Sequence, residues 1–272
     1  MSKNISASIV LYQNTISQVE NLLDSLKSSQ YLQICIIDNS PIDTLKTTCE
    51  HYHNVQYFHT PENPGFGASH NHAVRIVCNS EIHFIINPDT YFKKETIAII
   101  STYLKENHDV CCVVPKIIYP DGMLQRLCKL LPSPINLFTR RFLPKVAKRL
   151  DYNYEMTWFN YDKIVEIPCA SGCFMALRTE SFRKLNGFDE QFFMYMEDID
   201  LSRRLAAIGK VIYLPDAVVT HEFAKGSYKS KKLLYAHIRS AIQYFNKWGW
   251  VFDKERTRIN KDAIAKIMKA SE

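Results

Sequence analysis

The feature that most constrains the fold of this sequence is an alternation of buried-type strands and amphipathic helices over its first 120 residues. Short apolar runs typical of strands occupy residues 5–12, 34–37, 55–58, 82–86 and 110–114. Apolar residues recur at helical spacing between them, in 16–26, 68–77 and 96–104. Runs that are apolar on both faces and are joined by helices are typical of parallel strands covered on both sides. The sequence therefore predicts an α/β fold built on a mostly parallel sheet.

The composition is that of a chain with a large core. The sequence is 46% hydrophobic and 23% charged, which excludes a mainly disordered state because there is ample apolar surface to bury. No run of 18 apolar residues is present, and the N-terminus lacks the basic and apolar regions of a signal peptide. We therefore expect a cytosolic chain without a membrane-spanning helix.

Eight cysteines are spread along the chain, and no two of them form a CxxC pair. In a reducing cytosol, such residues are usually free thiols rather than disulfides or metal ligands. We expect buried free thiols here.

The second half of the chain contains one irregular segment. Residues 121–163 hold several prolines, an aromatic cluster and a basic stretch, and we interpret them as an insertion or flap. The regular pattern resumes at 165–177. It predicts helices at 198–208 and 233–247 and strands at 211–214 and 218–221;.

Polar residues follow three of the predicted strands, at Asp38, at 63–71 and at Asp89. In an open parallel sheet, ligands bind beyond the carboxyl ends of the strands. A carboxylate such as Asp89 can hold Mg²⁺ or Mn²⁺ together with phosphate oxygens, or it can simply form a turn after Pro88. The two glycines of 63–71 allow close backbone approach before a helix N-terminus, although the loop lacks the GxGxxG dinucleotide fingerprint.

The densest group of carboxylates comes after an aromatic run at 192–196 and consists of Glu197, Asp198 and Asp200. Acids at a helix N-terminus are favoured by the helix dipole, so a capping cluster is one interpretation. The other is a general base, because apolar surroundings shift a carboxylate towards neutral pKa. His221 ends an apolar strand and is either a metal ligand or a half-buried side chain.

Two basic stretches contain no acid. One lies in 123–150 and the other runs from Lys225 to Arg239. Such stretches are either solvated faces or surfaces that attract an anionic membrane or a polyphosphate. Apolar residues are interleaved with the densest basic group, which favours a membrane surface; this group is Arg140, Arg141, Lys145, Lys148 and Arg149. The carboxylates and the lack of interleaved aromatic residues disfavour a nucleic-acid partner.

Taken together, the motifs resemble those of glycosyltransferase family 2, and more narrowly those of its bacterial rhamnosyltransferases. The resemblance covers about residues 5–250. It rests on Ile36-Ile37-Asp38-Asn39-Ser40, Asn63-x-Gly65-Phe66-Gly67-x3-Asn71, Asn87-Pro88-Asp89, Gly172-x2-Met175-x2-Arg178, Gly187-Phe188-Asp189-Glu190 and Phe193-x-Tyr195-x-Glu197-Asp198-x-Asp200-Leu201-x2-Arg204.

The resemblance implies a GT-A fold, which is Rossmann-like with a mostly parallel central sheet flanked by helices, here with a helical C-terminal extension. It implies one domain over 1–272. Within it, about 1–120 would bind the nucleotide sugar and about 121–222 would hold the acceptor and the catalytic residues. About 223–272 would form a basic helical region.

The resemblance also assigns roles to individual residues. It implies that Asp198 is the catalytic base, with Glu197 the less favoured candidate, and that Asp89 and His221 hold Mg²⁺ or Mn²⁺. The residues it implies around the donor are Asp38 at the nucleobase, Asn63, Gly67 and Asn71 in the nucleotide pocket, Asn87 and Asp89 at the diphosphate, and Gly172 and Arg204 in the donor and acceptor pocket. Asn87 stands where the family's DxD-like motif has its first acid.

The implied reaction is an inverting single displacement that moves L-rhamnose from dTDP-L-rhamnose to N-acetylglucosamine on undecaprenyl diphosphate. This is a step of O-antigen or related polysaccharide assembly, at the inner face of the bacterial cytoplasmic membrane. A family-2 transferase that uses a UDP-hexose and another acceptor is the main alternative. A non-catalytic binding module is the third.

Overall fold

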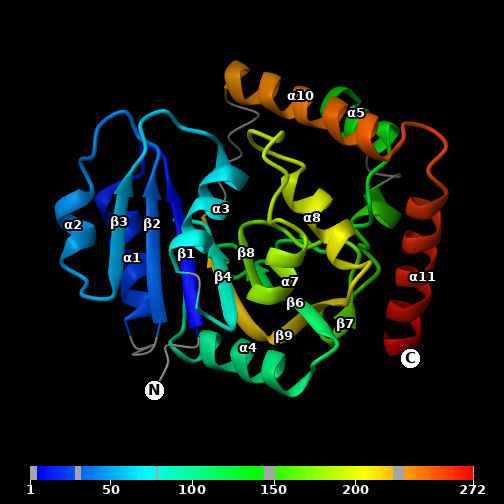
Figure 1. Cartoon of the computed structure of the whole chain (residues 1–272). Coiled ribbons are helices and arrows are strands. Elements are labelled where there is room, and N and C mark those ends of the chain that lie inside the picture. Colours follow the sequence, from blue (N-terminus) through cyan, green and yellow to red (C-terminus); the bar gives the residue numbers. More distant parts are fainter. Residues whose placement is uncertain (1–4, 28–31, 78, 144–150, 223–229, 272) are drawn as a thin grey trace.

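The computed structural model describes residues 5–27, 32–77, 79–143, 151–222 and 230–271 (Figure 1). The strands are β1 Ile5–Leu11, β2 Leu32–Asp38, β3 Val55–His59, β4 Ile82–Ile86, β5 Thr90–Phe92, β6 Val110–Ile118, β7 Val165–Glu166, β8 Phe174–Arg178 and β9 Lys210–His221. The helices are α1 Ile16–Leu26, α2 Lys46–Glu50, α3 Phe66–Ile76, α4 Glu95–Glu106, α5 Pro134–Phe142, α7 Thr179–Lys184, α8 Glu197–Leu205, α10 Lys231–Trp248 and α11 Lys254–Ser271.

Within these residues, all the strands join one sheet in the order β3-β2-β1-β4-β8-β6-β9-β5, with β7 paired to β9. Strands β1 to β4 are parallel to one another where they pair, and β6 is parallel to β9. β8 runs antiparallel to both β4 and β6, and β5 runs antiparallel to β9. This arrangement confirms the predicted GT-A type of fold, a mostly parallel sheet flanked by helices with helical segments at the C-terminal end.

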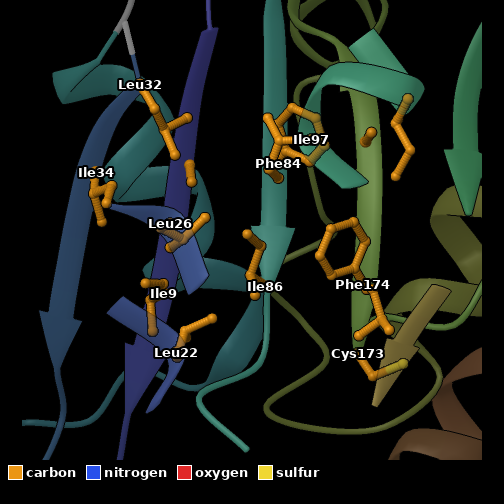
Figure 2. Close-up of a cluster of buried hydrophobic side chains, with 14 of the residues drawn as sticks. Ile9, Leu22, Leu26, Leu32, Ile34, Phe84, Ile86, Ile97, Cys173 and Phe174 are labelled. Carbon is orange, nitrogen blue, oxygen red and sulfur yellow. The ribbon is translucent and has the colours of Figure 1, made fainter. Parts of the chain in front are cut away.

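The strand side chains alternate between two faces of the sheet, as the two-residue period of a strand requires. In β4, Ile82, Phe84 and Ile86 point to the face covered by α1 and α4, while Ile85 lies on the opposite face. Figure 2 shows Phe84 and Ile86 beside Leu22, Leu26 and Ile97 on the first face. The opposite face is covered by residues of α3, α7, α8 and α11. Both faces are buried at the central strands, which explains why β1, β2 and β4 are mostly apolar.

Several local predictions differ from the structure. The two strands predicted at 211–214 and 218–221 are one strand, β9, whose pairing with β6 shifts register around Pro115. In 165–177, only the two ends are strands. The sequence pattern also missed β5 and α2, because short elements carry a weak hydrophobic period;. The helix α11 lies in the C-terminal region that is expected to be helical, although its strongly charged sequence shows no clear period of its own.

The described part of 121–163 is not a flap. Tyr154, Phe159 and Tyr161 are buried in the core on the second face of the sheet. The hydroxyl of Tyr161 donates to the carbonyl of Cys128, and the hydroxyl of Tyr213 donates to the carbonyl of Tyr161. These contacts bind the segment to β9, so the irregular sequence packs as part of the core.

The predicted thiols are confirmed for the cysteines that the structure describes. These are free and buried, and they are Cys35, Cys49, Cys111, Cys112, Cys128, Cys169 and Cys173. Burial raises the pKa of Cys35 to about 12, which makes this thiol unreactive near neutral pH;. In the same described ranges, none of the helices combines the length and the apolar character needed to cross a membrane.

A buried chain of hydrogen bonds joins β1, β4 and α3. The two ring nitrogens of His83 lie 2.7 Å from the hydroxyls of Ser6 and Ser8, and Ser8 Oγ lies 2.6 Å from Nδ1 of His70. All four side chains are fully buried. Burial, and after it the cation of Arg183, lowers the pKa of His83 from 6.5 to about 3, and burial also lowers the pKa of His70. Both histidines are therefore neutral in the folded protein near pH 7.

We predict that this network makes stability fall in mild acid. The unfolded chain takes up a proton on His83 near pH 6.5, whereas the folded chain resists protonation until about pH 3. The stabilisation is thus complete above pH 6.5 and is lost as the pH falls towards 3. For His83 alone, the free energy of unfolding should drop by about 2 kcal/mol between pH 7 and pH 5.

Urea unfolding at several pH values measures this effect. His83→Gln should be less stable at pH 7 but should show a shallower pH dependence. His108→Gln, at an exposed position, is the matched control and should behave like the wild type. An equal pH slope in wild type and His83→Gln would refute the assignment.

Candidate active site

The direction of the strands brings several of the predicted residues to one edge of the sheet. β8 is antiparallel to β4, so its amino end meets the carboxyl end of β4, with Phe174 opposite Ile86. The backbone N–H of Asn87 donates to the carbonyl of Cys173 at 2.9 Å. β5 pairs with β9 so that Thr90 lies opposite His221. The turn after β4, the start of β8 and the end of β9 therefore share this edge.

Asp89 and His221 form a close pair at this edge. Oδ1 of Asp89 lies 3.3 Å from Nε2 of His221, and Nδ1 of His221 lies 3.0 Å from Oε1 of Gln125. The side-chain nitrogen Nε2 of Gln125 also donates to the backbone carbonyl of His221 at 2.6 Å. Gln125 fixes the imidazole from the side opposite Asp89, as partners of metal-binding histidines often do.

The side chains at this edge suit a divalent cation. Oδ1 of Asp89 and Oδ1 of Asn87 are buried and accept no hydrogen bond from the described residues. Two buried oxygens and an imidazole nitrogen are donors that Mg²⁺ or Mn²⁺ accepts, provided that phosphate oxygens or water complete the shell. Within the described ranges, no group of three or more His, Cys, Asp or Glu side chains is placed to hold a metal by itself. The protein would thus supply part of the shell and the substrate the rest.

Asp198 lies at the first turn of α8 and is fixed by two backbone amides. Its Oδ2 accepts from Gly172 N at 2.9 Å and its Oδ1 accepts from Ile199 N at 2.8 Å. Burial raises the pKa of Asp198, and these two hydrogen bonds oppose part of that change. The result is a carboxylate held in one orientation and more basic than an ordinary aspartate.

Glu197 lies in a different environment although it is the next residue. Its side chain is buried, and its Oε2 has no hydrogen-bond partner among the described residues. Burial, and after it the nearby Asp198 carboxylate, raises the pKa of Glu197 well above its usual range. This environment disfavours the ionised form of Glu197, which makes it a weaker candidate for a base than Asp198;.

The backbone before α8 is strained. Tyr195 and Met196 both have left-handed φ angles, of 70° and 68°. Non-glycine residues adopt this conformation at a cost of about 1–3 kcal/mol each, and such strain clusters at functional sites. The turn directs the first residues of α8 towards Gly172.

The loop 63–71 packs tightly against the segment 187–193, and its glycines serve this contact. A Cβ on Gly65, whose φ is 101°, would lie 2.3 Å from the carbonyl oxygen of Phe193. A Cβ on Gly67 would lie 2.8 Å from Cβ of Phe188. The side chain of Asn71 accepts from Phe188 N and donates to Phe188 O, both at 2.9 Å. Gly67 and Asn71 thus hold the two segments together, while Asn63 stands at the start of the loop with φ at 48°.

Asp38 ends β2 at the same sheet edge and is fully buried. Its Oδ1 accepts from Ser40 N at 2.9 Å and its Oδ2 accepts from the Tyr57 hydroxyl at 2.7 Å. Burial and the bond to Asp38 raise the pKa of Tyr57. Asp38 therefore shapes the turn at 38–40, and its contact with a nucleobase stays a prediction.

Arg204 holds the backbone that precedes α8. Its Nε donates to Asp200 at 2.8 Å, and its Nη1 donates to the carbonyls of Leu185 and Gly187. Asp200 also accepts from Trp248 Nε1 at 2.8 Å and lies 2.8 Å from Lys247 Nζ. Arg204 would therefore shape the pocket indirectly, through the backbone and the Asp200 side chain that it holds in place.

Two residues that support the site carry no signal in the sequence. Gln125 lies in the irregular segment and reaches His221 only through the folding of the chain. Trp248 follows Asp200 by 48 positions and meets it across α8 and α10. Neither residue belongs to a motif with a chemical signature, so pattern analysis could not have identified them.

Comparison with known proteins gives consistent matches. The family model for glycosyl transferase family 2 matches residues 6–185, and the model for the N-terminal domain of galactosyltransferase matches 158–228. The chain is 26% identical over 241 residues to the rhamnosyltransferase WbbL of Escherichia coli, covering 83% of this chain and 87% of that protein. It is 26% identical to an N-acetylglucosaminyl-diphospho-decaprenol L-rhamnosyltransferase of Mycobacterium tuberculosis, covering 74% of this chain and 69% of that protein.

Solved structures agree on the fold. The mannosyltransferase PcManGT of Pyrobaculum calidifontis, solved with GDP-Man and Mn²⁺, superposes with a TM-score of 0.60 at 16% identity. The match covers 99% of this chain and 76% of that one.

Proposed function

This chain belongs to glycosyl transferase family 2, and we propose that it transfers L-rhamnose from dTDP-L-rhamnose to N-acetylglucosamine on undecaprenyl diphosphate. That the chain is a glycosyltransferase follows from the family and from its relatives. The donor and the acceptor are our proposal. They are supported by two relatives that are named as rhamnosyltransferases, one of them with N-acetylglucosaminyl-diphospho-decaprenol in its name.

The observation that carries the proposal is the hydrogen bond from Gly172 N to Asp198. It fixes a basic carboxylate at the start of β8, beside the turn that carries Asn87 and Asp89. A reacting sugar between these two groups would have a proton acceptor on one side and a site for its diphosphate on the other. This is what an inverting displacement requires.

In the proposed mechanism, Asp198 accepts the proton of the acceptor hydroxyl as that oxygen attacks the anomeric carbon. The hydrogen bonds from Gly172 and Ile199 keep the carboxylate oriented throughout. Asp89 and His221, with Asn87, would hold the cation, which when bound supplies positive charge against the diphosphate leaving group. Mn²⁺ in a neighbouring structure of the same fold supports a divalent ion.

We propose that the two parts of the single domain divide the substrates. Residues 1–120 would bind the nucleotide, with Asp38, Asn63, Gly67 and Asn71 around it. Residues 121–222 would bind the acceptor and hold the catalytic residues, and Gly172 and Arg204 would help to shape the pocket for donor and acceptor. The region 223–272 would support the membrane side.

We also propose that the chain works at the inner face of the cytoplasmic membrane, where the polyprenyl acceptor resides. The basic group named for this contact is only partly described. Lys145, Lys148 and Arg149 lie outside the described residues, as do the side chain of Arg141 and the residues Lys225 and Lys229. Arg140 is half-buried and lies 2.6 Å from Glu155, so it is neutralised within the protein.

The second candidate is a family-2 transferase that takes a hexose from UDP. The match of residues 158–228 to a galactosyltransferase model favours it. Incubation of the protein with dTDP-L-rhamnose or UDP-hexoses and a lipid-diphosphate N-acetylglucosamine, read by mass, separates the two. A product heavier by a deoxyhexose supports the proposal. Transfer of a hexose alone refutes it.

We predict that Asp198→Asn abolishes transfer and leaves donor binding nearly intact. The amide has the same shape but cannot accept the proton, and loss of a general base typically lowers the rate by about two to four decades. Single-turnover transfer and donor titration measure the two effects. Asp216→Asn, at an exposed position of β9, is the control. Turnover like that of the wild type in Asp198→Asn would remove this residue from the mechanism and point to Glu197.

A second prediction concerns the cation. Asp89→Ala should raise the Mg²⁺ or Mn²⁺ concentration needed for half-maximal activity by roughly tenfold or more, because a carboxylate ligand is gone. His221→Ala should give a smaller shift in the same direction. Metal titrations after treatment with EDTA measure both. If EDTA leaves the wild type fully active, Asp89 and His221 do not hold a required metal.

A further inference from the structure

The helix α10 exposes a row of large apolar side chains. Tyr235, Ile238 and Ile242 are 69%, 44% and 43% exposed. Their spacing of three and four residues places them on one face of the helix. A helix on the surface of a globular protein normally turns its apolar face inward, so an outward apolar row needs an explanation.

Neighbouring segments also expose large apolar side chains. The helix α5 packs beside α10 through Leu137, which lies in one cluster with Tyr244 and Phe245 (Figure 1). On α5, Ile135 and Phe138 are mostly exposed, and Phe252 just beyond α10 is 95% exposed. We call the exposed side chains Ile135, Phe138, Tyr235, Ile238, Ile242 and Phe252 the α5–α10 surface.

The charged residues within α10 and α5 themselves have one sign. No Asp or Glu occurs in 230–252 or in α5. Lys231, Lys232 and Arg239 are exposed on α10 beside the apolar row. Exposed apolar groups with a basic border are typical of helices that lie in the interface of an anionic membrane.

The inner side of α10 touches the turn that leads to the proposed base. Ser240 Oγ donates to the carbonyl of Met194 at 2.9 Å, and the rings of His237 and Tyr195 lie 4.8 Å apart. Tyr195 precedes Asp198 by three residues. A surface bound to the outer side of α10 would therefore lie about one helix diameter, roughly 10 Å, from this turn.

We propose that the α5–α10 surface inserts into the interface of an anionic lipid bilayer and so brings the active site to its acceptor. The proposal rests on the proposed function, since it is a lipid-linked acceptor that requires this approach. It assigns the membrane contact to apolar insertion by α10 and its neighbours. The basic residues beside the row add attraction to anionic headgroups.

A second copy of this chain is a poorer occupant of the surface. A symmetric pairing through the outer face of α10 would place Lys231, Lys232 and Arg239 of each copy against a segment, 230–252, that is itself basic and contains no Asp or Glu;. Like charges placed opposite one another oppose association. An anionic bilayer meets the same charges with the opposite sign.

Sedimentation of the full chain with lipid vesicles tests the proposal. The wild type should bind vesicles of phosphatidylcholine with phosphatidylglycerol more strongly than vesicles of phosphatidylcholine alone. The triple variant Tyr235→Ser, Ile238→Ser, Ile242→Ser should bind the anionic vesicles more weakly, by about tenfold or by a larger factor. The matched control replaces three exposed apolar residues elsewhere, Ile42→Ser, Ile164→Ser and Met268→Ser, and should bind like the wild type.

Activity with two acceptors separates this inference from the proposed function. With a short water-soluble acceptor analogue, the triple variant should match the wild type, which also shows that it is folded. With the acceptor in vesicles, the variant should be slower by a similar factor to its loss of binding. If the wild type transfers to neither acceptor, the proposed function fails, whatever the vesicle binding shows.

Three results would overturn the inference. The first is no preference of the wild type for anionic vesicles. The second is equal vesicle binding by the wild type and the triple variant. The third is a wild-type dimer in sedimentation equilibrium that the triple variant dissociates, because the surface would then be an interface between copies.

Discussion

The arrangement of the candidate site depends on the reversed direction of β8 in a sheet whose other central strands run one way. The carboxyl ends of parallel strands meet at one edge, where a polar loop can follow each strand. Because β8 runs the other way, its amino end lies at that edge, and Gly172 can donate to Asp198 while Cys173 accepts from Asn87. Two backbone contacts thus connect the residues of the turn after β4 to the first turn of α8. If β8 were parallel to β4, Gly172 and Cys173 would lie at the opposite end of the strands, away from Asn87.

The position of α8 is fixed from its other side by the C-terminal helices. Arg203 is buried and forms two hydrogen bonds with Asp253 at 2.6 and 2.7 Å, and its guanidinium lies 4.2 Å from the Trp248 ring centre. Removing one partner of a buried ion pair typically destabilises a protein by about 3–5 kcal/mol, because the other charge stays buried alone. Through Asp200 and Arg203, the helix that carries Asp198 is held to α10 and to the start of α11. The same α10 carries the exposed apolar row, so one helix connects the surface to the site.

Much of the fold could be predicted because a strand that is buried on both faces appears in the sequence as a short run of apolar residues. The runs at 5–12, 34–37, 55–58 and 82–86 correspond to β1 to β4, and the helical periods correspond to α1, α3 and α4. The pattern failed where burial does not set the period. The charged face of α11 hides its few core residues, such as Ile267, and the buried aromatic residues of 154–161 follow no regular spacing.

The sequence by itself determined the parallel first half of the sheet, the family, and the residue types at the strand ends, because local order and apolar periodicity are written residue by residue. Only the tertiary structure decided which of those residues meet. It brings His221 to Asp89 across 132 positions of the chain and adds Gln125, which no motif marked. It also gives Asp198 and Glu197 different environments. Asp198 accepts two backbone hydrogen bonds, whereas Oε2 of Glu197 is buried without a partner among the described residues. Such distinctions depend on contacts between distant segments. These contacts follow from the order and direction of the strands in the folded sheet, which cannot be read from a single sequence.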